Sequence, residues 1–183
     1  MNISVFCGSS QPHNEQIAFA AHEMGRQIAL GGHTLLYGGS NLGLMGQVSG
    51  GALEAGGTVI AVIPTFFSEE IINSQPVSHI VRVATMAERK EYLIAHSDAF
   101  VALPGGIGTL DEVLEVMVHN QLGPLRDTNH RDKPVLLYNP DGFWHPFLQQ
   151  IDRMGEDGFF RSGRRPNIQS FNNIKEIIAN CNL

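Results

Sequence analysis

Short apolar runs alternate along this chain with longer segments in which apolar residues recur every three or four positions. The short runs predict buried β-strands over residues 3–7, 34–37, 58–63, 79–83, 99–103 and 133–138. The longer segments predict helices over 13–30, 44–55, 65–72, 86–95, 113–118, 144–154 and 174–181. Strands that alternate with helices are typical of an α/β protein, whose parallel sheet is covered by helices on both faces.

No repeat, low-complexity tract or linker divides the 183 residues, so we expect a single domain over 1–183. In parallel sheets of this kind, ligands bind at the carboxyl ends of the strands. Loops rich in small residues follow the strands there, namely Gly8-Ser9-Ser10, Gly38-Gly39-Ser40 and Pro104–Thr109. The sequence therefore predicts a binding site where these loops meet.

The segment Pro104-Gly105-Gly106-Ile107-Gly108-Thr109 lies between a predicted strand and a predicted helix. Glycines let backbone N–H groups approach an anion, and a helix N-terminus carries partial positive charge, so this segment predicts a phosphate site. It is no Walker A loop, because no lysine follows Gly108. It also lacks the third glycine of the dinucleotide fingerprint, since Asp111 stands at that position.

The carboxylate of Glu112 has two interpretations. Thr109-Leu110-Asp111-Glu112 matches a capping box, with threonine at the N-cap and glutamate three residues later. Alternatively, an acid beside an anion site indicates chemistry. Arg89 and Lys90 present a similar choice near the start of another predicted helix: they belong either to a solvated face with Glu88 and Glu91 as partners, or to the anion site.

Overall charge and cysteine usage narrow the class of protein. A formal charge of −6 disfavours nucleic acid as a partner, because nonspecific binding needs a basic face. Cys7 and Cys181 form no metal or redox pair, the histidines show no metal-ligand spacing, and no segment matches a signal peptide or a membrane span. We therefore expect a cytoplasmic protein that needs no metal or other cofactor and contacts no membrane.

Two motifs together resemble a known family. Residues 104–112 match Pro-Gly-Gly-x-Gly-Thr-x-x-Glu, and residues 86–90 match Met-x-x-Arg-Lys. With Cys7-Gly8-Ser9-Ser10, Tyr37-Gly38-Gly39 and further segments (Gly43-Leu44-Met45-Gly46 and Gln121-Leu122-Gly123), nearly the whole chain resembles the LOG (Lonely Guy) family of cytokinin riboside 5′-monophosphate phosphoribohydrolases. Members have often been labelled lysine decarboxylases, but nothing in this sequence indicates pyridoxal phosphate chemistry.

The resemblance implies a Rossmann-like doubly wound sheet, a homodimer, and hydrolysis of a nucleoside 5′-monophosphate to free base and ribose 5-phosphate. It implies that Arg89 and Glu112 are the catalytic pair. It assigns substrate binding to Gly105, Gly106, Ile107, Gly108, Thr109, Lys90, Glu70 and Gly39. The connection over residues 124–132 is longer than the family's usual one, so the base preference stays open.

Two other classes remain as alternatives. One is a nucleotide-binding or carrier protein of the same fold without hydrolysis, since phosphate loops serve both uses. The other is a DNA-processing protein of related fold, which the negative charge disfavours.

Overall fold

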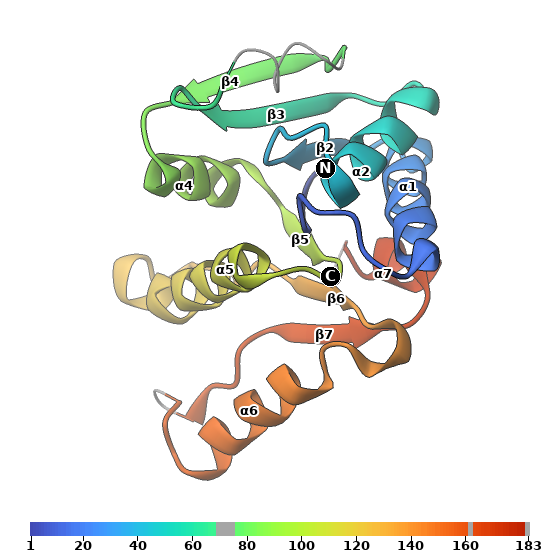
Figure 1. Ribbon diagram of the computed structural model, residues 1–183. Coiled ribbons are helices and arrows are strands. Elements are labelled where there is room, and N and C mark those ends of the chain that lie inside the picture. Colours follow the sequence, from blue (N-terminus) through green and yellow to red (C-terminus); the bar gives the residue numbers. More distant parts are fainter. Residues whose placement is uncertain (69–75, 161–162, 182–183) are drawn as a thin grey trace.

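A computed structural model of the chain describes residues 1–68, 76–160 and 163–181 (Figure 1). The strands are β1 (Asn2–Phe6), β2 (Thr34–Tyr37), β3 (Val59–Pro64), β4 (His79–Val83), β5 (Ala99–Ala102), β6 (Val135–Tyr138) and β7 (Ile168–Phe171). The helices are α1 (Glu15–Leu30), α2 (Gly43–Glu54), α4 (Met86–His96), α5 (Ile107–Arg126), α6 (His145–Glu156) and α7 (Ile174–Asn180), with a 3₁₀ turn, η1 (Pro140–Gly142).

The strands form one parallel seven-stranded sheet in the order β4-β3-β2-β1-β5-β6-β7. The chain starts in the middle at β1, moves outward to β4, and returns to the other side of β1 as β5. Val5 of β1 lies opposite Val101 of β5. The connections that leave β1 and β5 therefore diverge, and such a switch point opens a crevice at the carboxyl ends of the strands.

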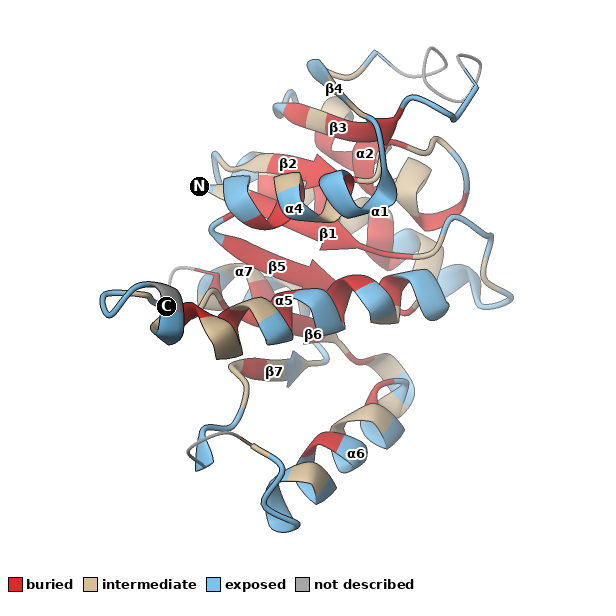
Figure 2. Cartoon of the chain, turned by 90° about the vertical axis from the view of Figure 1, so that its left-hand side faces the viewer, coloured by how far each residue is buried: buried red, intermediate tan, exposed pale blue. Residues whose placement is uncertain are grey.

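Helices cover both faces of the sheet, as the alternation predicted. Apolar residues of α1, α2 and α7 pack on one face, with Met24, Val48 and Ile177 fully buried. Residues of α4, α5 and α6 pack on the other face, where Leu93 and Val116 are examples. The central strands are buried along most of their length, and α5 alternates between buried and exposed positions (Figure 2). This arrangement confirms the predicted Rossmann-like doubly wound fold.

The structure differs from the predicted elements in three places. A seventh strand, β7, pairs with β6 at the edge of the sheet, where the apolar pattern predicted none. The helix expected over 113–118 begins earlier, at Ile107, and continues to Arg126. Of the short helix expected over 65–72, residues 65–68 form a turn and bend, and the rest lies outside the described residues.

Candidate active site

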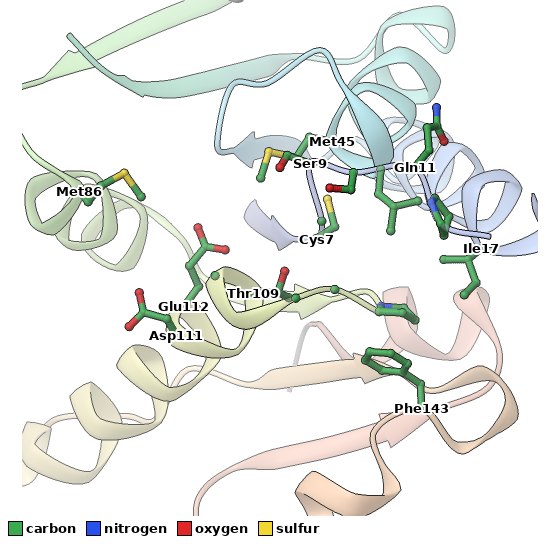
Figure 3. A pocket seen from close by; sticks show the side chains of 18 of the residues that line it. Cys7, Ser9, Gln11, Ile17, Met45, Met86, Thr109, Asp111, Glu112 and Phe143 are labelled. Atoms are coloured by element: carbon green, nitrogen blue, oxygen red, sulfur yellow. The ribbon is translucent and has the colours of Figure 1, made fainter. Parts of the chain in front are cut away.

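A cavity of about 500 Å³ opens at the switch point between β1 and β5 (Figure 3). One wall is the loop after β1, residues 7–12, and the opposite wall is the turn from β5 into α5. Met45 of α2 and Met86 of α4 line one end, while Phe143, which follows η1, lines the other. Two of the three small-residue loops predicted to meet therefore do so here; Gly38 and Gly39 do not line the cavity.

The N-terminus of α5 forms the wall predicted to bind phosphate. Its N-cap is Gly106, and no side chain caps the helix. The first N–H groups of the helix are consequently available to an anion. Gly105 and Thr109 are in close contact, because a Cβ on Gly105 would overlap the Thr109 side chain. Gly105, Gly106, Gly108 and Thr109 all line the cavity, whereas the Ile107 side chain is exposed.

The capping-box interpretation of Glu112 is wrong. Because α5 starts at Ile107, Thr109 lies inside its first turn and Glu112 lies in the second, too far along to cap the helix. Thr109 is 3% exposed, and its side chain lies against Gly105, in the turn that precedes α5. Gly106 takes the N-cap position because its backbone is extended there and its carbonyl accepts from Leu110.

Glu112 forms a buried ion pair with Arg89 at the wall of the cavity. Arg89 Nη2 donates to Glu112 Oε1 at 2.9 Å, and the two side chains are only 8% and 7% exposed. The Glu112 side chain points away from α5, into the space between Met86 of α4 and Cys7 (Figure 3). A buried carboxylate in the wall of a cavity, paired with a buried cation, is a candidate functional group.

Burial raises the pKa of the Glu112 carboxyl to about 7, against the attraction of Arg89, which lowers it. Asp111 raises this pKa further, and Lys90 lowers it. Cys7 also lines the cavity, and burial raises the pKa of its thiol. Cys7 therefore contributes an uncharged side chain to the cavity. A carboxyl that titrates near neutrality suits a group that holds or moves a proton.

Arg89 is positioned by both its helix and a glycine of the neighbouring strand end. Side chains do cap the start of α4: Glu88 N–H donates to Thr85 Oγ1 at 3.1 Å, and Glu88 Oε2 accepts at 2.8 Å from the N–H of Ala84, the residue before the N-cap. Gly38 lies against the guanidinium, and a Cβ at this position would come within 2.8 Å of Arg89 Cζ. Arg89 Nε is buried without a hydrogen-bond partner, so it remains a donor for a ligand.

One interpretation of the sequence placed Lys90 on a solvated face with Glu88 and Glu91 as partners. The structure gives Lys90 other partners. Its Nζ bonds both carboxylate oxygens of Asp111, at 3.1 and 3.0 Å, and Glu115 Oε2 at 2.8 Å. The Lys90 side chain is 17% exposed and lies outside the cavity lining. The structure therefore brings Lys90 to α5 but not to the cavity.

The remaining predicted substrate-binding residues lie apart from the cavity or cannot be described. Gly39 has φ of +83°, a backbone conformation that favours glycine, and it packs on Ile63. Glu70 lies outside the described residues. Met45, Met86 and Phe143 line the cavity but were not predicted, because a lone apolar residue carries no signal that separates a cavity wall from the core.

The described ranges 1–68, 76–160 and 163–181 can also be searched for a metal site, a membrane-spanning helix and a lysine that could hold pyridoxal phosphate. They contain no group of three or more histidine, cysteine, aspartate or glutamate side chains placed to hold a metal ion. None of their helices is long and apolar enough to span a membrane. None of the chain's three lysines, Lys90, Lys133 and Lys175, lines the cavity, so the site does not fit a pyridoxal phosphate Schiff base.

Comparisons with known proteins place nearly the whole chain among its relatives. The family described as "Possible lysine decarboxylase" matches residues 45–181. The chain is 40% identical, over 96% of its length and 75% of the relative's, to cytokinin riboside 5′-monophosphate phosphoribohydrolase LOG5 of Arabidopsis thaliana. It is 42% identical to LOG4 of the same plant, over 96% of this chain and 79% of LOG4.

A solved structure of the molybdenum cofactor (Moco) carrier protein of Chlamydomonas reinhardtii is also similar. It superimposes with a TM-score of 0.69 at 28% identity, over 97% of this chain and 93% of that one. The fold is thus shared with a carrier, while the nearly full-length identity at about two residues in five is with the plant phosphoribohydrolases. The description "Possible lysine decarboxylase" is a generic label, and the chain belongs to the LOG family of cytokinin riboside 5′-monophosphate phosphoribohydrolases.

Proposed function

We propose that this protein hydrolyses the N-glycosidic bond of a nucleoside 5′-monophosphate, yielding a free base and ribose 5-phosphate. The observation that carries the proposal is the buried Arg89–Glu112 pair beside the uncapped N-terminus of α5, in one cavity. The names of the plant relatives support a cytokinin riboside 5′-monophosphate as substrate, and AMP is its simplest analogue.

The 5′-phosphate binds the N–H groups at the start of α5, from Gly106 to Thr109, and this contact delivers the ribose to Glu112. As the C1′–N bond breaks, its electron pair leaves with the base and positive charge develops on the sugar, as in glycoside hydrolysis. The Glu112 carboxylate stabilises that charge and accepts a proton from the water that attacks C1′. The departing base takes up a proton from solvent, and Glu112 returns to solvent the proton that it accepted from the attacking water. Arg89 holds Glu112 and the substrate in register.

The test measures free base by chromatography after incubation of the protein with AMP, isopentenyladenosine monophosphate or adenosine. Each charge-assisted hydrogen bond to phosphate contributes about 1.5–3 kcal/mol. Loss of two such bonds predicts a kcat/KM for adenosine at least roughly a hundredfold below that for AMP. Equal turnover of AMP and adenosine, or no base from either monophosphate, would refute the proposal.

The carrier alternative has one specific observation in its favour, the structural similarity to the Moco carrier protein at 28% identity. A carrier would bind a phosphorylated ligand at α5 and leave it intact. Calorimetric binding of AMP without release of adenine would favour this second function. The buried Arg89–Glu112 pair weighs against it, because a carrier gains nothing from a buried acid beside the anion site.

We further propose that the protein forms a symmetric dimer through α5. Ile107, Leu114, Val118 and Leu125 are 84%, 39%, 50% and 58% exposed, and their spacing puts them on one face of the helix. Two copies packed by this face would bury it, and two-fold dimers are the commonest oligomers. Light scattering should give twice the 20.0 kDa of one chain, and Val118→Glu should give the monomer. A wild-type particle of one chain at micromolar concentration would exclude the dimer.

The cytoplasm is the compartment we propose, supported by Cys7 and Cys181, which are both buried free thiols in this fold. Fractionation of cells that express the full chain tests this, and recovery with an extracellular or membrane fraction would contradict it.

A further inference from the structure

Two adjacent polar contacts join helices α4 and α5. The consecutive residues Arg89 and Lys90 of α4 meet the consecutive residues Glu112 and Asp111 of α5. The Arg89–Glu112 contact is buried at the cavity wall. Lys90 and Glu115 lie outside the cavity lining, and Asp111, which pairs with Lys90, lies at its edge. We refer to these five residues as the α4–α5 clamp.

Within the clamp, Lys90 bridges two carboxylates of α5. An ammonium group has three N–H donors and no acceptor. Nζ makes three contacts, at 3.1, 3.0 and 2.8 Å, with the carboxylates of Asp111 and Glu115. These carboxylates, Glu115 foremost, raise the pKa of Lys90, so it remains charged. A phosphate that approached Lys90 would therefore compete with these two carboxylates for its charge.

We propose that Lys90 is a positioning residue that fixes α4 on α5 so that Arg89 reaches Glu112, and that it is not a ligand of the substrate phosphate. This inference rests on the proposed function for the reaction that the clamp serves. The placement of Lys90 outside the cavity lining and its contacts with two carboxylates of α5 carry it.

The clamp also sets the charge environment of Glu112. Among residues 1–68, 76–160 and 163–181, the charged and titratable groups that act on Glu112 are Arg89 and Lys90 from α4, Asp111 from its own helix and Cys7, which follows β1. Lys90 lowers the pKa of Glu112 and Asp111 raises it. Removal of either charge should therefore shift the titration of Glu112, in opposite directions.

The kinetic test compares Lys90→Met, Lys90→Arg and, as matched control, Lys175→Met, which removes an exposed lysine of α7. For Lys90→Met we expect kcat on AMP to fall about tenfold or more, because small misplacements of reacting groups are costly. KM for AMP and the preference for AMP over adenosine should stay within about threefold of wild type. Lys90→Arg keeps the charge and should recover most of the turnover, and the control should match wild type. A large rise in KM, or a loss of the preference for AMP, in Lys90→Met would identify Lys90 as a phosphate ligand and overturn the inference.

A second measurement needs no turnover. Carbon-13 NMR of glutamate-labelled full-length protein, with the Glu112 signal assigned from its loss in Glu112→Gln, gives the pKa of Glu112 directly. We expect an upward shift in Lys90→Met, a downward shift in Asp111→Asn, and no shift in Lys175→Met or Lys90→Arg. An unchanged pKa in Asp111→Asn, or in a folded Lys90→Met, would overturn the inference. If wild type releases no base from AMP, the proposed function fails, and this titration still decides whether the clamp exists.

Discussion

Replacement of Glu112 by glutamine removes one negative charge from the cavity and preserves the shape of the side chain. A carboxylate about 4 Å from a developing unit of positive charge, at an effective dielectric constant of about 20, contributes roughly 4 kcal/mol. That energy corresponds to a factor of about a thousand in rate. The glutamine dipole retains part of this, so we expect kcat on AMP to fall at least roughly a hundredfold.

The pH dependence of the same variant provides an internal check. Burial raises the pKa of Glu112 to about 7, and the proposed chemistry needs the ionised form. Wild-type kcat/KM should therefore rise with pH up to about 7 and level off above it. The substrate phosphate titrates near pH 6 in both proteins. The difference between the pH profiles of kcat/KM for wild type and for Glu112→Gln therefore isolates Glu112. The glutamine variant should lack the rise in kcat/KM near pH 7.

Thermal unfolding separates a chemical effect from a structural one. The folded-state pKa of Glu112 lies above the ordinary value of 4.5, so wild type loses stability as the pH rises from about 4.5 through about 7. Glu112→Gln removes the stability lost when the buried carboxyl ionises, but it leaves Arg89 without its counterion. The glutamine amide oxygen still accepts a hydrogen bond from Arg89 Nη2. These effects oppose each other, so we expect a melting temperature within a few degrees of wild type.

Free base is assayed against Glu91→Gln, an exposed glutamate of α4, as control. Retention of more than about a tenth of wild-type kcat, or of the limb near pH 7, by folded Glu112→Gln would refute the catalytic assignment.

Three other substitutions test the fold and the site. Arg89→Ala should lower kcat on AMP at least roughly a hundredfold, through lost positioning of Glu112; turnover close to wild type would exclude this role. Gly38→Ala puts a Cβ against the Arg89 guanidinium and should lower kcat in the wild-type background but cause no additional loss in the Arg89→Ala background. Additive losses in the double variant would show that Gly38 does not act through Arg89. Leu36→Ala, in the fully buried centre of β2, should lower the free energy of unfolding in urea by about 2–5 kcal/mol, and a loss below about 1 kcal/mol would contradict the core placement.

The local pattern of the sequence determined most of the architecture. Apolar runs and helical periods placed six of the strands and the order of the main helices, because burial of one face imposes a period that a short segment displays by itself. The edge strand β7 lacks such a signal. Its four residues, Ile168–Phe171, include Gln169 and Ser170 and have only β6 as a neighbour, so they carry no continuous apolar run.

The sequence also indicated the residue types of the candidate site but not their contacts. Glycines after a strand predicted the anion wall, and the two motifs selected Arg89 and Glu112. The pattern at Thr109–Glu112 suggested a capping box that does not exist, while the one at Thr85–Glu88 does cap α4. Both match the same pattern, and only the position at which each helix starts distinguishes them.

Tertiary structure decided which charges pair. Arg89 and Lys90 are neighbours in sequence, yet Arg89 lines the cavity and faces a buried carboxylate, whereas Lys90 lies outside the cavity lining and faces two partly exposed carboxylates. Their partners lie more than twenty residues away on α5, so no local pattern reveals them. Hydrophobic periodicity is a property of a single segment. Ion pairing and the raised pKa of Glu112 depend on how much water is excluded where two helices meet, and only the packed fold fixes that.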